Sequence, residues 1–347
     1  MQNYEPLRKR FKLMAFSSLK PIHENIGFPV KKLFSPMDLP DFPYKMPILN
    51  RLMVDAMYLF GLEKALKDYD LVCGRETYFH FTQQALNAKK KGYVKKVLVT
   101  CSETIPFNHE SIWGRKNFKQ RVIREADHFH CLTNKAKECL IKEGADSKKI
   151  SVIGYGIDLN RFRNKEIRSK NKNLRILFVG RLEEQKGIRE LAKAYRQLKK
   201  DFPNLELQIV GKGPLKGLIE QVGAKVISLP YSQMPLAYQE ADIFVLPSKP
   251  TEYWEEYYGM ALLEAMVSGL PVVTTNCGAI TEVVGETAKI VTYGKAKELY
   301  LALKGFVKNP VLRKEYSQRA LSQARKYFDC QKQAKKIGKM WTDLCKS

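Results

Sequence analysis

The chain has 347 residues, of which 44% are hydrophobic, and it is long enough for two domains that each bury a core. Its 60 basic and 36 acidic residues give a net charge of +24, so the surface attracts nucleic acid, anionic lipid headgroups or phosphorylated substrates. No run of about 18 uncharged apolar residues occurs, which excludes a membrane-spanning helix, and the charges in residues 7–12 exclude an N-terminal signal core.

The cysteines predict the compartment. Seven of them are scattered along the chain without a Cys-x-x-Cys pair, and Cys73, Cys101 and Cys131 fall in apolar, strand-like runs. A buried, reduced thiol is expected in such runs. We therefore predict a cytoplasmic protein, and its basic surface suggests peripheral attachment to the inner face of a membrane as an extension of that prediction.

The first half of the chain alternates short apolar strands with amphipathic helices, which predicts a parallel sheet covered by helices on both faces. A first strand is expected at 10–18, an irregular proline-rich connection at 20–50 and a helix at 51–67. The strands that follow are expected at 70–73, 96–100, 129–132 and 150–153, and the helices at 79–91, 114–125 and 134–143.

A charged, polar stretch then predicts a linker at 163–174, with one aliphatic residue before Leu174. Beyond it the alternation restarts, so the chain is predicted to hold two doubly wound α/β halves, whose ligands bind at the carboxyl ends of the strands. The expected strands are 175–179, 205–210, 226–229, 243–246 and 271–275, and the expected helices are 187–200, 214–222, 233–240 and a short one after Gly259.

Two glutamates eight positions apart mark the most informative stretch, residues 256–275. A loop that carries Glu256 turns at Gly259 into a short helix that contains Glu264. The free N–H groups at 259–261 point the same way as the loop carboxylate, and donors beside a carboxylate suit a polyol that carries a phosphate. The alternative is a plain amphipathic helix with two glutamates.

A second motif lies at 179–187, between a strand and a helix. Gly180 and Gly187 let the backbone approach a ligand, while Arg181 and Lys186 supply two cations. A diphosphate needs this arrangement, because charge-assisted hydrogen bonds add to the helix N-terminus. The alternative is a strand-to-helix turn with solvated charges.

Both motifs, Glu-x7-Glu and Gly-Arg-x4-Lys-Gly, resemble those of the retaining nucleotide-sugar glycosyltransferases of family 4. The resemblance implies that Glu256 lies beside the donor sugar and that Glu264 holds the ribose hydroxyls. It also implies that Arg181 and Lys186 hold the diphosphate and stabilise the charge on the leaving group. The other donor contacts that it implies are at Gly180, Gly211, Gly213, Ile227, Tyr258, Gly259, Met260 and Ala261.

This family has the GT-B fold, so the resemblance implies two Rossmann-like domains facing a cleft and a last helix that crosses back to the first domain. We therefore predict an acceptor-side domain at 1–162, the linker, a nucleotide-sugar-binding domain at 175–325 and the returning helix at 326–347.

The resemblance is close at 125–290 and looser before. Family members begin with a strand and a Gly-rich loop, whereas residues 4–8 look like the tail of the helix that follows these. We therefore expect the first strand and loop to be missing here, through a late start or genuine loss.

Many members also carry a histidine after the strand matched by 96–100. Here Glu103 and His109 are the candidates to face the reacting centre, and an exposed loop is the alternative.

Other motifs predict less. Asp68 and Asp70 fit a metal-binding Asp-x-Asp, but they lie at the boundary between a helix and a buried strand. Members of family 4 are usually metal-independent, so we expect no cofactor and no metal. No zinc spacing, Walker loop or Gly-x-Ser-x-Gly elbow occurs. The lysine-rich run 89–96 is interpreted as a solvated loop, or else as a contact for anionic lipid or a phosphate-bearing acceptor.

The predicted function is that of a retaining hexosyltransferase. It would move a sugar from a UDP- or GDP-sugar to a saccharide or lipid-linked acceptor in glycan or cell-envelope biosynthesis. Because no protein nucleophile is visible, retention is expected from acceptor attack on the face of the leaving group. The alternatives are a non-catalytic nucleotide- or glycan-binding module and a nucleotide-sugar epimerase. A nucleic-acid-binding protein is disfavoured because no recognition helix, zinc spacing or aromatic RNP strand is present.

Overall fold

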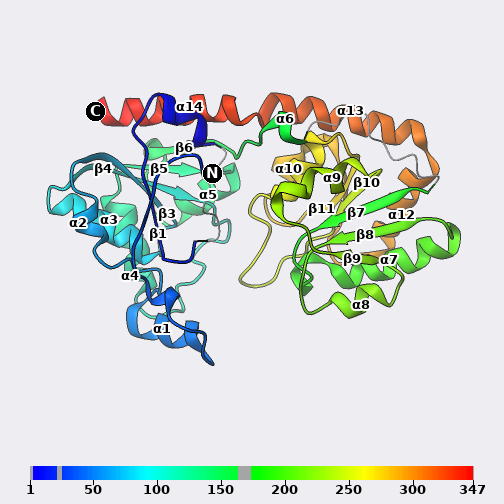
Figure 1. The fold of residues 1–347 in the computed structure, drawn as a ribbon, viewed down its shortest axis with the longest axis horizontal. Coiled ribbons are helices and arrows are strands. Elements are labelled where there is room, and N and C mark those ends of the chain that lie inside the picture. The colour runs from blue at the N-terminus through cyan, green and yellow to red at the C-terminus, as the bar shows by residue number, and fades with distance from the viewer. Residues whose placement is uncertain (1–2, 22–25, 163–172, 347) are drawn as a thin grey trace. The chain divides into compact units, whose positions relative to one another are not determined.

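The computed structural model describes residues 3–21, 26–162 and 173–346. The chain forms two compact units: unit 1 comprises residues 1–156 and 330–347, and unit 2 comprises residues 157–329. Figure 1 shows a parallel sheet with helices around it in each unit. Among the described residues, no helix has both the length and the apolar character needed to span a bilayer.

Unit 1 is built on a four-stranded parallel sheet in the order β3-β4-β5-β6. Its second strand is almost wholly buried, which explains why it reads as a continuous apolar run rather than an alternating one. The strands are β3 (Tyr69–Arg75), β4 (Val94–Cys101), β5 (His128–Cys131) and β6 (Ile150–Val152), and the helices between them are α3 (His80–Lys90), α4 (Arg115–Glu125) and α5 (Asn134–Lys142).

Helix α14 (Cys330–Lys346) is the expected C-terminal helix, and it packs within unit 1. Its Trp341 stacks on Tyr4 with ring centroids 5.8 Å apart and meets the edge of Phe11 at 5.4 Å. Ile337 and Trp341 are buried in one cluster with Leu7, from the 3-10 helix η1 (Glu5–Lys9). The last helix is therefore held to unit 1 by a small apolar core of its own.

Two predictions for the N-terminal region are wrong. The segment 20–50 is not irregular throughout: it holds β2 (Val30–Lys32), η2 (Pro36–Asp38) and the start of α1 (Lys45–Met53), and β2 pairs in parallel with β1 (Ala15–Ser17). The single helix expected at 51–67 is instead the end of α1, a turn and α2 (Leu62–Ala65).

The break between α1 and α2 has a local cause. Val54 takes a positive φ of 66°, and the next residue, Asp55, is buried. The Asp55 carboxylate accepts hydrogen bonds from Arg115 at 3.1 Å and from the backbone N–H of His80 at 3.0 Å. A straight helix would not bring this carboxylate to α4 and to the start of α3, so the tertiary contacts override the helical spacing of the apolar residues.

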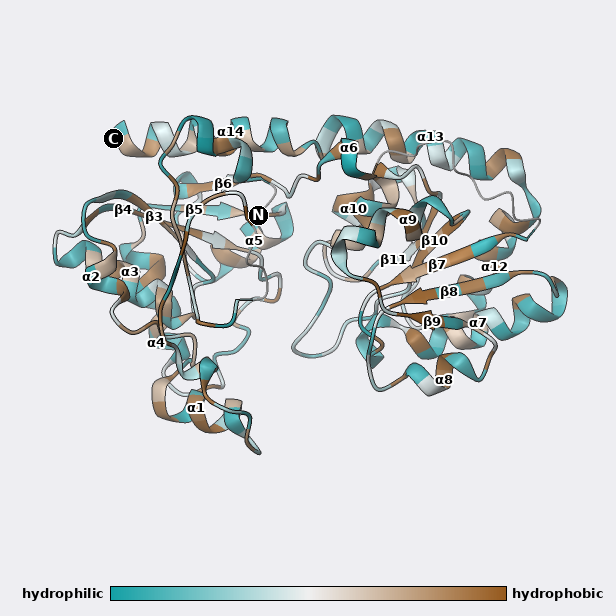
Figure 2. Ribbon diagram, in the orientation of Figure 1, coloured by the Kyte–Doolittle hydropathy of each residue, from teal (hydrophilic) through white to brown (hydrophobic). Residues whose placement is uncertain are grey.

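Unit 2 holds a six-stranded parallel sheet in the order β12-β11-β10-β7-β8-β9. Its central strands are buried on both faces, and Figure 2 shows them as the most hydrophobic part of the unit. The strands are β7 (Arg175–Val179), β8 (Glu206–Val210), β9 (Lys225–Ile227), β10 (Ile243–Leu246), β11 (Val272–Thr275) and β12 (Lys289–Val291). The helices are α6 (Leu159–Phe162), α7 (Ile188–Asp201), α8 (Lys216–Glu220), α9 (Met234–Gln239), α10 (Met260–Val267), α11 (Ile280–Val284), α12 (Ala296–Lys308) and α13 (Pro310–Tyr327).

The predicted end of the first domain at residue 162 is placed too late. Residues 157–162 belong to unit 2, because Phe162 on α6 is fully buried against Tyr238 at a ring distance of 5.8 Å. Residues 326–329 also belong to unit 2, and α14 begins only at Cys330. Most of the predicted linker, 163–172, lies outside the described residues.

Candidate functional site

Three loops meet at the carboxyl edge of the unit 2 sheet, after β7, β8 and β10. The N–H of Gly180 donates to the carbonyl of Val210 at 3.0 Å, and the N–H of Leu182 donates to that of Lys212 at 2.8 Å. The third loop joins through the N–H of Lys249, which donates to Gln185 at 2.9 Å. The loops that carry the two sequence motifs are therefore tied to each other by backbone hydrogen bonds.

Glycine is required where these loops touch. A Cβ on Gly211 would lie 1.9 Å from the carbonyl oxygen of Gly180, and one on Gly187 would lie 1.9 Å from that of Pro247. A Cβ on Gly213 would lie 2.5 Å from the carbonyl oxygen of Leu182. The glycines predicted as donor contacts thus let backbone approach backbone, and they have a structural purpose whether or not a ligand binds.

Lys186 and Glu256, one from each motif, form the centre of this edge. Lys186 Nζ lies 2.7 Å from Glu256 Oε2, which also accepts a hydrogen bond from Ser248 Oγ at 2.8 Å. The ammonium lies 4.7 Å from the ring centroid of Trp254, within cation–π range. Both side chains are largely buried, so the ammonium and the carboxylate form a strong local dipole where the three loops meet.

The backbone of Glu256 is fixed by the turn after β11. Gly278 has a φ of 62°, and a Cβ there would lie 2.3 Å from the carbonyl oxygen of Glu256. The N–H of Ala279 donates to that same oxygen at 2.9 Å. Glycine is therefore needed at position 278, because any side chain there would collide with the backbone of Glu256.

Helix α10 begins beside Glu256. Gly259 caps it with a φ of 74°, and the N–H groups at the start of the helix follow directly. Tyr258 is buried, whereas Met260 is partly exposed and Ala261 is half-buried. The predicted grouping of a loop carboxylate with a helix N-terminus is present in the structure.

Glu264 lies on α10, buried, and both its oxygens accept tyrosine hydroxyls. Tyr238 donates to Oε2 at 2.7 Å and Tyr231 to Oε1 at 3.2 Å. Burial raises the pKa of Glu264, while the hydrogen bonds from Tyr238 and Tyr231 and the charge of Arg161 oppose that shift. Ile227, at the end of β9, accepts a hydrogen bond from the N–H of Gly211 at 2.9 Å, which places it at the same sheet edge.

Sequence reasoning did not anticipate Arg161, Tyr231 and Tyr238. The guanidinium of Arg161 lies 4.0 Å from the ring centroid of Tyr231 and donates to its carbonyl oxygen at 2.6 Å. The two residues are 70 positions apart, so no local pattern joins them. A tyrosine soon after β9, at the edge where ligands of such sheets bind, was the one available signal.

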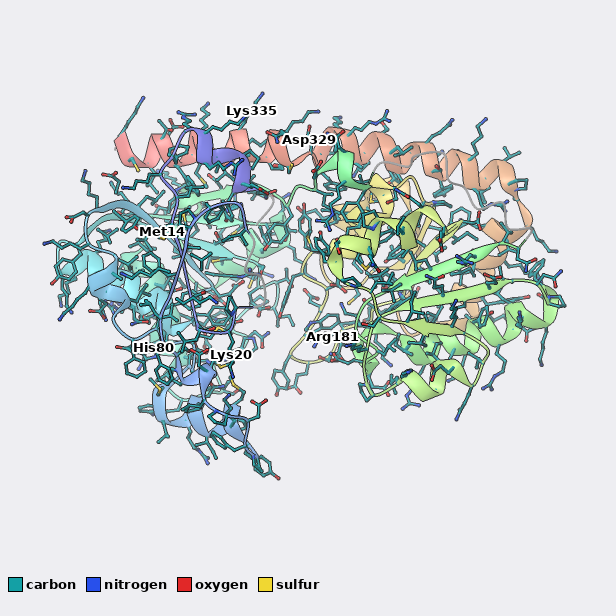
Figure 3. All side chains as sticks on the ribbon, viewed as in Figure 1. Met14, Lys20, His80, Arg181, Asp329 and Lys335 are labelled. Atoms are coloured by element: carbon teal, nitrogen blue, oxygen red, sulfur yellow. The ribbon has the colours of Figure 1, made fainter. Side chains whose placement is uncertain are left out.

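Arg181 is not drawn into the Lys186–Glu256 pair. Its side chain, labelled in Figure 3, is mostly exposed. It pairs with Glu183 at 3.1 Å. The motif therefore supplies one largely buried cation, Lys186, and one exposed cation, Arg181.

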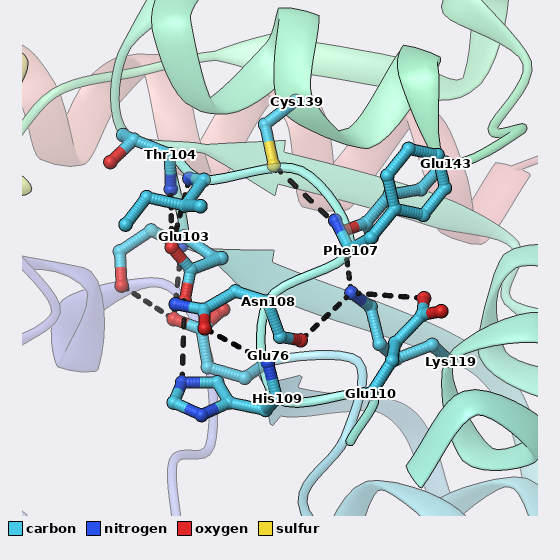
Figure 4. Close-up of polar contacts among 12 residues, drawn as sticks. Glu76, Glu103, Thr104, Phe107, Asn108, His109, Glu110, Lys119, Cys139 and Glu143 are labelled. Carbon is cyan, nitrogen blue, oxygen red and sulfur yellow. Dashed lines mark hydrogen bonds and ion pairs between the residues drawn. The ribbon is translucent and has the colours of Figure 1, made fainter. Parts of the chain in front are cut away.

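In unit 1, the structure brings Glu103 and His109 together in the loop after β4, as Figure 4 shows. The Nε2 atom of His109 lies 3.5 Å from Glu103 Oε2. Glu103 also accepts the N–H groups of Thr104 and Ile105, both at 2.9 Å, and the side-chain amide of Asn108 at 3.0 Å. Burial by itself would raise the pKa of Glu103, but the hydrogen bonds from His109, Ile105 and Thr104 lower it. Glu103 thus orders its own loop and orients His109.

A buried lysine, Lys119, holds this loop in place. Lys119 Nζ contacts Glu143 at 2.5 Å and Glu110 at 3.4 Å, and donates to the carbonyl oxygen of Asn108 at 3.2 Å. Glu143 also accepts the N–H of Phe107 at 2.8 Å. None of these residues was singled out from the sequence, because a lysine on a basic helix resembles a solvated one.

Glu76 adds a further carboxyl to this region. It is buried directly after β3 with a φ of 52°, and it accepts both the N–H and the hydroxyl of Ser102, at 3.0 and 2.5 Å. Burial raises its pKa, against the hydrogen bonds from Ser102 and the charge of Arg75. The carboxyl joins the ends of β3 and β4.

Members of the acidic pair and of the lysine run of unit 1 take part in ion pairs in the structure. Across the described residues, no group of three or more His, Cys, Asp or Glu side chains could hold a metal ion. Asp70 pairs with Lys95 at 2.7 Å at the surface. Two other lysines of the run pair within unit 1, Lys89 with Asp127 at 2.6 Å and Lys91 with Glu63 at 2.5 Å.

In a comparison with known proteins, each half of the chain matches a glycosyltransferase family model. A family model described as glycosyl transferases group 1 matches residues 160–323, and one described as glycosyltransferase family 4 matches residues 30–161. A putative colanic acid biosynthesis glycosyltransferase of Salmonella typhimurium is 32% identical over 199 residues, which cover 54% of this chain and 49% of that protein. An uncharacterized glycosyltransferase of Methanocaldococcus jannaschii is 24% identical over 327 residues, covering 88% and 82%. The chain spans about half the length of the first curated relatives that it matches.

Solved structures share the fold of the whole chain. Anabaena HepE in complex with UDP matches with a TM-score of 0.79 at 17% identity, covering 99% of this chain and 94% of that one. Sucrose-phosphate synthase from Thermosynechococcus elongatus matches with a TM-score of 0.80 at 17% identity, covering 99% and 91%. The predicted GT-B architecture of two Rossmann-like domains is confirmed.

Proposed function

This chain belongs to the glycosyltransferases of family 4, the group 1 type, and we propose that it moves a sugar from a nucleotide-diphosphate donor to an acceptor with retention of configuration. The observation that carries the proposal is the Lys186–Glu256 pair, held beside the N-terminus of α10 by three interlocked loops. A cation, a carboxylate and helix N–H groups within one buried edge suit a phosphate that carries a sugar.

Lys186 is the proposed stabiliser of the leaving diphosphate. Its ammonium pairs with Glu256, and a bound diphosphate would take over part of that pairing. Glu256 would then turn its oxygens to the hydroxyls of the donor sugar while Ser248 keeps hold of the carboxylate. Arg181, exposed at the same loop, adds the second cation once a ligand arrives. Charge placed where it develops in the transition state is the largest electrostatic contribution such a site makes.

Glu264 is the proposed ribose ligand. Its carboxylate is kept in place by Tyr238 from within the core, and the Tyr231 hydroxyl at Oε1 marks the direction from which a ribose hydroxyl would approach. The helix start at Gly259, Met260 and Ala261 and the loop of Gly211 and Gly213 are proposed to line the nucleotide. Ile227 at the end of β9 is proposed to face the base.

UDP-sugars are the first choice of donor and GDP-sugars the second. HepE, which shares the fold, has been crystallised with UDP and with UDP-glucose. We propose that no metal and no cofactor take part, since Lys186, Arg181 and the α10 N-terminus supply the positive charge that a metal would otherwise provide. Retention is proposed to come from acceptor attack on the face of the leaving group.

A saccharide or lipid-linked saccharide of a glycan or cell envelope is the proposed acceptor. Relatives of this chain are named for colanic acid biosynthesis and for teichuronic acid biosynthesis. In unit 1, His109 is the proposed substrate-facing residue of the loop after β4, and Glu103 is the residue that positions it.

The test is nucleotide binding followed by turnover. Ligand at a hundredfold its dissociation constant adds about 2.7 kcal/mol of stability, so the melting temperature is measured with UDP, GDP, ADP and their sugars. A shift with one base that is lost in Lys186→Ala and retained in Lys193→Ala, an exposed lysine on α7, would support the donor site. Release of the nucleoside diphosphate from the preferred sugar then tests transfer, with and without a chelator. Binding without any turnover would instead favour the non-catalytic module.

A further inference from the structure

Exposed apolar side chains gather at one place in unit 1. Of the 22 large apolar side chains exposed among the described residues, six lie within residues 39–52, which form the approach to α1 and α1 itself. Tyr44 is 79% exposed and Leu52 is 74% exposed. Single exposed apolar residues are ordinary, but such a cluster marks a surface that something else covers. The members of this α1 surface are Leu39, Phe42, Tyr44, Met46, Ile48 and Leu52.

The fold holds this segment out in a fixed shape. Lys45 Nζ donates to the carbonyl oxygens of Met37 at 2.9 Å and Leu39 at 2.6 Å, which closes the turn before the helix. At the far end, Asn50 accepts the N–H of Ala56 at 3.1 Å. Leu49 is the one residue of α1 that is buried. Figure 1 shows α1 projecting from the rest of unit 1, and Figure 2 shows its apolar residues along the projection.

Neighbouring elements extend the α1 surface. Leu19 is exposed. It lies beside the α1 surface because the N–H groups of Leu19 and Lys20 donate to Asp38 at 3.1 and 3.2 Å. Trp113 is 73% exposed and precedes Gly114, which lies against Val54 at the end of α1. A tryptophan and a tyrosine at the edge of an apolar surface are typical of a membrane interface, where one end of the ring is dry and the other wet.

The charges around this surface favour an anionic partner. Arg51 on α1 and Lys116 near Trp113 are exposed. Lys20, labelled in Figure 3, is also exposed, and its N–H donates to Asp38, directly before this surface. The nearby acids are engaged: Asp41 pairs with Lys45 at 3.3 Å, and Asp55 is buried with Arg115. Unit 1 as a whole carries 32 basic and 17 acidic residues. A second copy of the chain would bring the same positive charge, whereas an anionic bilayer offers both negative headgroups and an apolar interior.

We propose that the α1 surface seats unit 1 on an anionic lipid bilayer, with Tyr44, Ile48 and Leu52 entering the headgroup boundary while Arg51 and Lys20 meet the phosphates. The helix lies in the interface and does not cross it. This inference is independent of sugar transfer, because vesicle binding is measured without a donor.

The experiment is co-sedimentation with vesicles of phosphatidylcholine and phosphatidylglycerol in equal parts. The variant Ile48→Gln/Leu52→Gln removes apolar contact without changing charge, and Leu301→Gln/Val311→Gln makes the same change at two exposed apolar residues of unit 2. The wild-type chain and the unit 2 variant should bind alike, and the α1 variant should bind at least about tenfold more weakly, from the loss of two buried aliphatic side chains. Equal melting temperatures and equal UDP binding of both variants show that the fold and the nucleotide edge are unaffected.

Two results would overturn the proposal. Equal vesicle binding by the wild-type chain and the α1 variant would mean that charge elsewhere on the molecule attracts the lipid. Absence of vesicle binding, together with a concentration-dependent dimer that the α1 variant loses in sedimentation velocity, would mean that a second copy covers the surface.

Discussion

Each unit contains a buried lysine paired with a glutamate, and the two pairs differ in how completely they are enclosed. Lys119 is 2% exposed and contacts Glu143, Glu110 and a backbone carbonyl. Lys186 is 13% exposed and contacts Glu256 and the face of Trp254. Lys119 stands on a helix and holds a loop, whereas Lys186 stands in a loop at the carboxyl edge of a sheet.

The difference teaches which buried ion pairs can act on a ligand. Lys119 donates to Glu143 and to the carbonyl oxygen of Asn108 and forms an ion pair with Glu110, so its enclosed ammonium is committed to these oxygens rather than to a substrate. Lys186 retains N–H donors for a ligand. Ser248 also donates to Glu256, so breaking the Lys186–Glu256 pair leaves the carboxylate with a hydrogen-bond partner. A buried charge therefore does not by itself identify a binding site. Hydrogen-bond donors that remain available at the ligand-binding edge of a sheet do identify one.

The largest effect is expected from Lys119→Met. Removing this cation leaves Glu143 buried without its partner, which should cost about 3–5 kcal/mol in the free energy of unfolding. Urea denaturation measures it. Lys116→Met, at an exposed position of the same helix, should change stability by no more than about 0.5 kcal/mol. A Lys119 variant as stable as this control would contradict the structural role.

Lys186→Ala should act on the reaction instead. Loss of one preorganised charge at the leaving group should slow transfer by about 10²–10³-fold, equivalent to about 2.7–4 kcal/mol in the barrier. The melting temperature should fall little, because Ser248 still holds Glu256. Release of nucleoside diphosphate is measured beside Lys193→Ala. Unchanged specific activity with a large loss of melting temperature would assign Lys186 to folding.

Glu264→Gln should weaken binding of the donor by about 10- to 150-fold, since one charge-assisted hydrogen bond contributes about 1.5–3 kcal/mol. Calorimetry with UDP and with 2′-deoxy-UDP separates this role from general damage to the site. The wild-type chain should prefer the ribonucleotide, and the variant should lose most of that preference. If the variant lost affinity equally for both nucleotides, the carboxylate would not be the ribose ligand.

The smallest effect is expected at Glu103, and it depends on pH. Because the pKa of Glu103 is lowered in the folded chain, its stabilisation is present above its ordinary pKa and is lost as pH falls through the folded value. Glu103→Gln should cost about 1–2 kcal/mol at neutral pH. The difference from wild type should shrink as the medium becomes acidic, as followed by urea denaturation across the acidic range. A difference that stays constant with pH would show that the charge of Glu103 contributes nothing.

How far the sequence predicted the candidate site depended on how local each contact is. Lys186 and Glu256 were predictable because each belongs to a strand–loop–helix motif whose residues are neighbours in the chain. The meeting of the two motifs spans 70 residues, and only the family resemblance indicated it. Arg161 and Tyr231 are equally far apart and belong to no motif, so they were missed.

The same principle accounts for the errors in the fold. The alternation of strands and helices from residue 69 to residue 275 was predicted closely, because buried parallel strands are continuous apolar runs. The helix expected at 51–67 failed at Val54 and Asp55, where contacts with α3 and α4 impose a turn. Apolar spacing could not distinguish these two cases.

By itself, the sequence determined the class of fold, the existence of two halves and the loops that carry charge and glycine, because hydrophobic periodicity and turn chemistry act over a few residues. Only the tertiary structure decided which charges are enclosed and which remain available. It also decided that Glu264 is held by two tyrosines, and that the apolar residues of α1 lie outside the core. The physical reason is that burial and pairing depend on contacts between distant segments, and folding sets these contacts while sequence spacing does not record them.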